Sequence, residues 1–359
     1  MTIAHLRPAF FDEVERPWVQ HGELTATLFR YSTGVEAIRL SHARGSLVVL
    51  PYLGQMIWSA AFDDVDLTMK SFFPAPRRVT TIGETYGCFA FHSGLLRNGV
   101  PGPGDDHAAH GEMPCAPMDT AAIEAGEDEE GPFLRVLGTY DYAMGFGPHY
   151  LARPSVTLRE GSALFDMAMV VENLSALPMD LMYMCHANFA YAEGAELLQQ
   201  TPFDAASTRV RRAVPRHVRP NPEYLAFIDR LAADPSESRF LAQGASYDPE
   251  QVFYVEGLER DDKGKTHAML LRPQGDAFAM RYRPDQFRKT VRWILNGGDQ
   301  SVAAFALPST CEPEGYTAER AKNNVLELRS GESASFDVRL GYLNKAEALA
   351  ESERFASYR

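Results

Sequence analysis

The sequence lacks a long hydrophobic run and a cysteine pattern, and both absences narrow the class of protein. No segment approaches the roughly 20 consecutive apolar residues that a membrane-spanning helix needs, and residues 1–11 lack the long apolar core of a secretory signal. The four cysteines lie far apart and form no C-x-x-C pair, whereas a secreted disulfide scaffold is small and rich in cysteine. We therefore expect a cytoplasmic protein with buried free thiols.

Positive charge is also in short supply. The sequence has 48 acidic residues against 35 lysines and arginines, so its formal net charge is −13. An acidic surface repels phosphate backbones and anionic lipid headgroups. We expect neither nucleic acid nor a membrane as a partner. The sequence leaves open whether the protein forms a homodimer.

Nucleotide-binding and hydrolase signatures are missing as well. The sequence contains no P-loop and no G-x-S-x-G elbow. The glycine-bearing segments 87–94 and 99–104 do not follow a strand and open a helix, as a dinucleotide fingerprint must. Strands and helices do not alternate, which argues against a parallel sheet.

The sequence has instead many short apolar runs with turn signals between them. Runs at 155–159 and 163–171 flank Glu160-Gly161-Ser162, which predicts a hairpin, and runs at 251–258 and 266–271 around residues 261–264 predict another. Asn221-Pro222 opens one segment with helical spacing. The segment 287–295 could be a helix or a strand.

These patterns predict an all-β protein built as a large β-sandwich with one or two short helices. With 359 residues, 45% of them hydrophobic, the chain can bury a sizeable core. We expect a single domain over residues 1–359. Residues 1–40 are expected to be peripheral, and residues 201–235 to form an insertion of loop and helix.

Histidines are the first candidates for chemistry. His110 stands beside a glycine in a loop, where a histidine often contacts a ligand, whereas His186 lies in a predicted strand, where many histidines are hydrogen-bonded core residues. His107 and His110 have the spacing of half a metal site, but no third ligand accompanies them. We predict no metal, and a site made by His107, His110 and His186 remains the alternative.

The order of several short motifs resembles the aldose 1-epimerase, or galactose mutarotase-like, superfamily. The motifs are Pro51-x-x-Gly54-x-x-Ile57, Lys70-Ser71, Ser93 to Gly99, His110 to Pro114, Tyr183 to Phe189, Gly194 with Glu196-Leu197, Pro308 to Thr310, Glu312 to Gly315 and Leu328 to Glu332. They cover roughly residues 45–343. The His-Gly loop followed far downstream by the strand histidine is their most specific part.

The resemblance implies a galactose mutarotase-like supersandwich with its ligand cleft on the larger sheet, and a cofactor-free isomerase whose partner is a small sugar or sugar derivative. In that family a carboxylate takes the proton from the anomeric hydroxyl while a histidine protonates the ring oxygen. The ring opens and recloses on its other face. By motif position, His186 would be the acid and His110 a substrate-hydroxyl contact, and Arg97 and Asn98 would touch sugar oxygens.

The sequence departs from the family pattern at the base. Many members carry a glutamate immediately before the proline of the late motif, where this chain has Leu307. Glu312 and Glu314 are the nearest carboxylates and our candidates for the base, with an ordinary surface location as the alternative. A chain without a base would be a non-catalytic sugar-binding or sensor protein. A metal-dependent sugar isomerase or lyase is a third hypothesis.

An aromatic residue and several arginines complete the candidates. Trp293 could stack on a sugar face or belong to the core. Arg283 shares a strand face with Arg281 and could bind a carboxylate or phosphate of the substrate, or be solvated. We expect a solvated surface run from the arginines at positions 209, 211, 212, 216 and 219.

Overall fold

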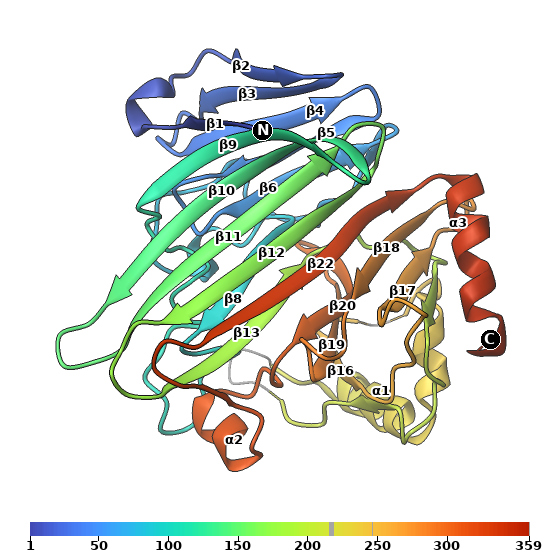
Figure 1. The fold of residues 1–359 in the computed structure, drawn as a ribbon. Coiled ribbons are helices and arrows are strands. Elements are labelled where there is room, and N and C mark those ends of the chain that lie inside the picture. Colours follow the sequence, from blue (N-terminus) through green and yellow to red (C-terminus); the bar gives the residue numbers. More distant parts are fainter. Residues whose placement is uncertain (215–218, 246, 359) are drawn as a thin grey trace.

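Two large antiparallel sheets make up most of the computed structural model, which describes residues 1–214, 219–245 and 247–358 (Figure 1). The smaller sheet has nine strands, in the order β1 (Thr2–His5), β9 (Thr120–Asp128), β10 (Gly131–Ala143), β11 (His149–Arg159), β12 (Leu164–Asn173), β22 (Ser333–Leu343), β18 (Ala277–Tyr282), β17 (Thr266–Leu271) and β14 (Glu196–Gln199). The prediction of an all-β sandwich is confirmed.

The larger sheet carries thirteen strands and holds the site described below. Its main order is β15 (Thr208–Val210), β16 (Gln251–Val255), β19 (Lys289–Asn296), β20 (Ser301–Ser309), β13 (Met179–Ala187), β8 (Ala90–Leu95), β6 (Met56–Phe62), β5 (Gly45–Leu50), β4 (Glu36–His42), β3 (Leu24–Arg30) and β2 (Arg16–His21). Two short strands complete it, with β21 (Leu326–Leu328) on β13 and β7 (Val65–Asp66) on β6. The segment 287–295, left open above, is therefore mostly strand.

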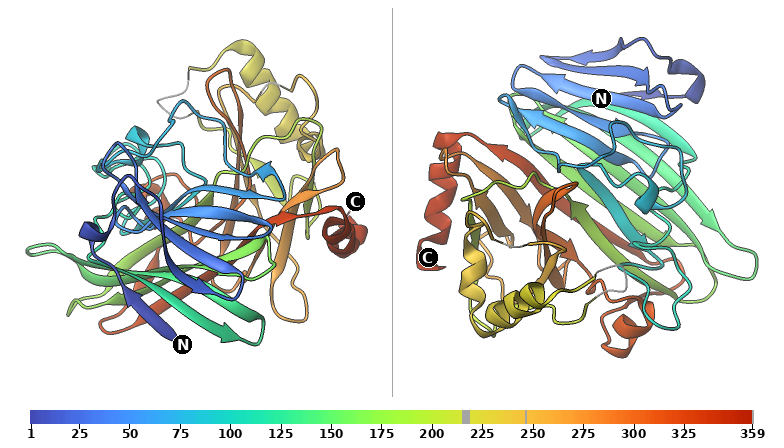
Figure 2. Two further views of the ribbon diagram at one scale, coloured as in Figure 1. Left: turned by 90° about the horizontal axis from the view of Figure 1, so that it is seen from above. Right: turned by 180° about the vertical axis from the view of Figure 1, so that it is seen from behind.

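Three short α-helices, α1 (Pro222–Ala233), α2 (Tyr316–Ala321) and α3 (Lys345–Ser352), lie around the sheets (Figure 2). The expected start of α1 is confirmed, because the Asn221 side chain accepts a hydrogen bond from the Tyr224 N–H and proline opens the helix. Four 3₁₀ turns cover Pro8–Phe10, Ile82–Glu84, Pro235–Arg239 and Glu353–Tyr358. None of the helices in the described ranges is long and apolar enough to cross a membrane.

One predicted hairpin is confirmed and the other is wrong. β11 and β12 pair directly around Glu160-Gly161-Ser162. In contrast, β16 pairs with β15 and β19 in the larger sheet, while β17 pairs with β14 and β18 in the smaller one. The turn signal itself is real, since Asp261 accepts hydrogen bonds from the N–H groups of Lys263 and Lys265. The turn belongs to a connection between the sheets.

The first forty residues lie at one edge of both sheets. β1 pairs with β9 as the outer strand of the smaller sheet, and β2 is the last strand of the larger one. Residues 201–235 contribute the short edge strand β15 and helix α1.

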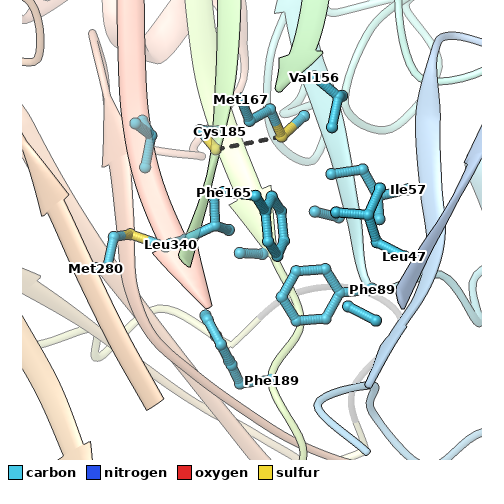
Figure 3. Packing of buried hydrophobic residues seen from close by; sticks show 14 of the residues in the cluster. Leu47, Ile57, Phe89, Val156, Phe165, Met167, Cys185, Phe189, Met280 and Leu340 are labelled. Carbon is cyan, nitrogen blue, oxygen red and sulfur yellow. Dashed lines mark hydrogen bonds between the residues drawn. The ribbon is translucent and has the colours of Figure 1, made fainter. Parts of the chain in front are cut away.

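The core lies between the sheets, and strand β13 shows how the site is placed relative to it. Tyr183, Cys185 and Ala187 point into the core, where Cys185 packs against Met167 of the opposite sheet (Figure 3). Successive residues of a strand face opposite sides. Met184 and His186 therefore emerge on the outer face of the larger sheet, where Met184 packs in a separate apolar cluster.

Candidate functional site

A cavity of about 460 Å³ lies on this outer face. Strands β13, β16, β19 and β20 supply one wall, loops near residues 72–86 and 100–110 supply much of the remainder, and Arg211, Glu250, Gln300 and Pro313 complete it. The lining consists of Phe72, Phe73, Ile82, Gly83, Tyr86, Val100, Ala109, His110, Met184, His186, Arg211, Glu250, Val252, Val291, Trp293, Gln300, Leu307 and Pro313. Of the predicted site residues, the structure brings His110, His186 and Trp293 together here.

His186 is buried in an aromatic setting. Its ring stacks on Phe91 with centroids 4.5 Å apart, and its Nε2 lies 3.2 Å from the Tyr86 hydroxyl. Its Nδ1 is buried and has no hydrogen-bond partner among the described residues. Burial and the neighbouring His110 lower the pKa of His186 well below its usual value. The imidazole is thus neutral at pH 7.

The loop that carries His110 depends on the glycine that follows it. Gly111 has a φ of 78°, and a Cβ there would lie 2.1 Å from the Arg97 carbonyl oxygen, so only glycine fits. His110 also has a positive φ, of 63°, and its N–H donates to the Gly99 carbonyl at 2.8 Å. This backbone places the His110 ring perpendicular to that of His186, with centroids 4.9 Å apart.

A chain of hydrogen bonds sets which ring nitrogen of His110 carries the hydrogen. Asn98 donates to the Cys311 sulfur at 3.3 Å, and its Oδ1 accepts the hydroxyl hydrogen of Ser93. Ser93 has only that one hydrogen, so its Oγ accepts from Nδ1 of His110, 3.0 Å away. Nε2 of His110 then carries a lone pair. Burial lowers the pKa of His110 to about 4, so the ring is neutral at pH 7.

The two carboxylates predicted as the base lie outside this lining. Glu312 is bound by Arg209 at 2.8 Å and by Lys322 at 2.7 Å. Burial opposes its ionisation, but Lys322 and Arg209 hold the pKa of Glu312 below its usual value. Glu314 accepts hydrogen bonds from Nη2 of Arg211 at 3.1 Å and from the Tyr254 hydroxyl. Both side chains are therefore committed to ion pairs beside the cavity.

The one carboxylate among the described lining residues is Glu250, which sequence reasoning missed. It directly precedes β16, and its Oε2 accepts a hydrogen bond from the Trp293 indole at 2.6 Å. Its negative charge raises the pKa of His110, in opposition to the larger effect of burial, so the two groups are electrostatic neighbours. No motif marks Glu250 in the sequence. Its place follows from the non-sequential neighbours β16, β19, β20 and β13.

The other predicted contacts are engaged elsewhere. Arg97 lies over the Tyr316 ring, 3.8 Å from its centroid, and donates to the Leu96 carbonyl. Asn98 is fully buried and acts through Ser93 rather than on the cavity itself. Arg283 is exposed and donates to the Lys263 carbonyl at 3.0 Å.

The prediction that the arginines between positions 209 and 219 form a solvated surface run is wrong for Arg211. The Arg211 side chain is only 10% exposed because it pairs with Glu314 and lines the cavity. Arg216 lies outside the described residues. His107, proposed as an alternative metal ligand, bonds through Nδ1 to the Ala108 carbonyl. Within the described ranges, no three His, Cys, Asp or Glu side chains are grouped as a metal site.

The fold is similar to that of solved galactose mutarotase-like proteins and aldose 1-epimerases. A provisionally assigned aldose 1-epimerase from Klebsiella pneumoniae superposes with a TM-score of 0.75 at 17% identity, covering 94% of this chain and 88% of that one. A galactose mutarotase-like protein from Clostridium acetobutylicum gives 0.56 at 13% identity, covering 90% and 99%. A galactose 1-epimerase from Lactobacillus acidophilus gives 0.54 at 13% identity, covering 92% and 98%. At such identities the likeness establishes the fold alone.

Residues 32–342 match the family described as a domain of unknown function, DUF4432, and the chain belongs to that family. No curated protein matches the sequence.

Proposed function

We propose that this protein is a cofactor-free isomerase of the aldose 1-epimerase type that binds a monosaccharide or sugar derivative in the cavity. The observation that carries this proposal is the convergence of Glu250, His110 and His186 on one cavity large enough for a sugar ring. The fold shared with a galactose 1-epimerase supports the choice of substrate class. Glu250 supplies the carboxylate that Leu307 cannot.

The proposed reaction moves protons at two oxygens that are both bonded to the anomeric carbon. Acid and base can therefore act on the substrate from one cavity, and the lining of this cavity contains both Glu250 and His186. Glu250 takes the proton from the anomeric hydroxyl, and His186 gives one to the ring oxygen. After the carbonyl turns, each group reverses its role. His110 accepts a hydrogen bond from a sugar hydroxyl through Nε2.

The protonation of His186 limits this reaction. Burial keeps the ring neutral, so His186 must take up a proton as the substrate binds, with the Glu250 carboxylate as the balancing charge. The protonated fraction of a group with a lowered pKa falls as the pH rises. We therefore expect kcat/KM to fall as the pH is raised above neutrality, which a rate profile between pH 6 and 9 measures.

The direct test is anomer exchange, followed by saturation-transfer NMR on a panel of aldoses and uronic acids. We expect exchange above the uncatalysed rate with the native protein and its loss in His186→Gln. A matched variant, Arg283→Gln, changes an exposed residue away from the cavity and should keep the activity. Exchange that survives in His186→Gln would contradict the proposed role of the histidine.

A second candidate function is non-catalytic sugar binding. Leu307, at the position where relatives often carry the base, favours it, and so does the neutral state of His186. This alternative predicts that sugars shift or broaden protein resonances while anomer exchange stays at the uncatalysed rate.

A further inference from the structure

The wall that the larger sheet presents to the cavity is apolar. Met184, Val252, Val291 and Leu307 line it, one residue from each of four neighbouring strands, and they pack as one cluster. Each is at most 7% exposed. None of these side chains can donate or accept a strong hydrogen bond.

The polar groups of the lining are few, and most already have partners. Tyr86 bonds to His186, Arg211 to Glu314, and Glu250 to the Trp293 indole. An ordinary aldose presents a hydroxyl on almost every carbon. A hydroxyl pressed against the apolar wall would give up its bonds to water without replacement, which disfavours binding.

From this mismatch we infer that the substrate is a deoxy sugar, an aldose in which hydrogen replaces at least one hydroxyl, with the deoxygenated carbon against the wall of Met184, Val252, Val291 and Leu307. The methylene or methyl group buries apolar surface where a hydroxyl would lose hydrogen bonds. This inference rests on the proposed function for turnover, whereas its statement about binding stands independently.

Matched pairs of sugars that differ by one oxygen test it: D-fucose against D-galactose, L-rhamnose against L-mannose, and 2-deoxy-D-ribose against D-ribose. For each pair, anomer exchange gives kcat/KM and an NMR titration gives Kd. We expect the deoxy sugar to be favoured by between about tenfold and a hundredfold in at least one pair, the discrimination an apolar pocket achieves against an added hydroxyl. Equal or better binding of the hydroxylated sugar in every pair would overturn the inference.

Two isosteric variants locate the preference. Val291 and Val302 belong to the same apolar cluster, but only Val291 lines the cavity. Val291→Thr places a hydroxyl in the wall and should reduce the deoxy preference severalfold, while Val302→Thr should leave it unchanged. An equal change in both variants would show that the wall does not set the preference.

The outcomes separate this inference from the proposed function. Tight, deoxy-selective binding without anomer exchange would support the substrate class and contradict the isomerase. Anomer exchange that favours the fully hydroxylated sugars would support the isomerase and contradict the inferred substrate class. Neither binding nor exchange with any sugar of the three pairs would overturn both.

Discussion

Two of the buried histidines have surroundings that differ in a way that separates a structural role from a chemical one. His267 and His186 are both 3% exposed. His267 uses both ring nitrogens, with Nδ1 2.5 Å from Glu351 and Nε2 3.0 Å from Asp261. His186 makes one hydrogen bond, of 3.2 Å to Tyr86, and its Nδ1 has no hydrogen-bond partner among the described residues.

The difference teaches what each site can do. The His267 cluster joins β17 to helix α3, because Glu351 belongs to that helix and also accepts from Arg281. Burial opposes ionisation of Asp261, yet His267 and backbone N–H groups lower its pKa to about 2. A ring satisfied on both sides has nothing to offer a ligand. A neutral ring that has an unpartnered nitrogen and borders a cavity can exchange protons with a ligand.

The largest expected effect comes from His186→Gln. We expect a fall in kcat/KM of about 10²- to 10⁴-fold, the usual contribution of a general acid or base. Stability should change little, because the side chain borders a cavity and makes one weak hydrogen bond. Anomer exchange and urea unfolding measure the two quantities. A large loss of stability with normal activity would show that His186 has a structural role like that of His267.

The reverse is expected for His267→Gln. Removing the ring leaves Asp261 and Glu351 as buried, partly unpaired charges, which should lower the free energy of unfolding by about 3 kcal/mol. The kcat/KM of the folded fraction should stay unchanged, since none of these residues lines the cavity. Urea unfolding gives the first value and rates corrected for the folded fraction give the second. Loss of activity without loss of stability would contradict the structural role of His267.

The histidines of the cavity also set a pH dependence. The pKa of His110 is about 4 in the folded protein and 6.5 in an ordinary environment, so the unfolded chain binds the proton more readily. The contribution of His110 to the free energy of unfolding is therefore fully present above pH 6.5 and declines as the pH falls from 6.5 through 4. Unfolding measured over this range in the native protein and in His110→Gln should show a smaller decline in the variant. Identical profiles would mean that His110 is not buried as a neutral ring.

The smallest expected change concerns the hydrogen position on His110. In the native protein, ¹⁵N shifts of this ring should show hydrogen on Nδ1 and none on Nε2. Ser93→Ala removes the acceptor at Nδ1 and should produce a mixture of both forms, with a severalfold rise in KM. Ser93→Thr keeps a hydroxyl and should restore the single form. Hydrogen on Nε2 in the native protein would reverse the direction assigned to the bonds among Asn98, Ser93 and His110.

Much of the fold could be predicted because strand patterns and turn residues are local. The Glu160-Gly161-Ser162 hairpin and the capped start of α1 are determined by residues that are adjacent in the sequence. The failed hairpin around residue 261 shows the limit, because the same turn chemistry also serves a connection between two sheets.

The site was predictable only where a short motif carried it. His110 and His186 were found through their motifs, and for Trp293 the sequence left two interpretations, stacking on a sugar or a place in the core. Glu250 was not found, because its place beside the histidines depends on the order of β16, β19, β20 and β13. Glu312 and Glu314 were nearest to Leu307 in sequence, but nearby arginines and a lysine bind them.

The central claim is that Glu250 is the base, and comparing Glu250→Gln with Glu312→Gln tests it most directly. Each change removes one carboxylate charge at nearly constant volume, one on the cavity lining and one beside it. Anomer exchange on the best sugar of the panel should fall by about 10²-fold or more in Glu250→Gln and stay near the native rate in Glu312→Gln. Native exchange in Glu250→Gln, or its loss in Glu312→Gln alone, would contradict the assignment.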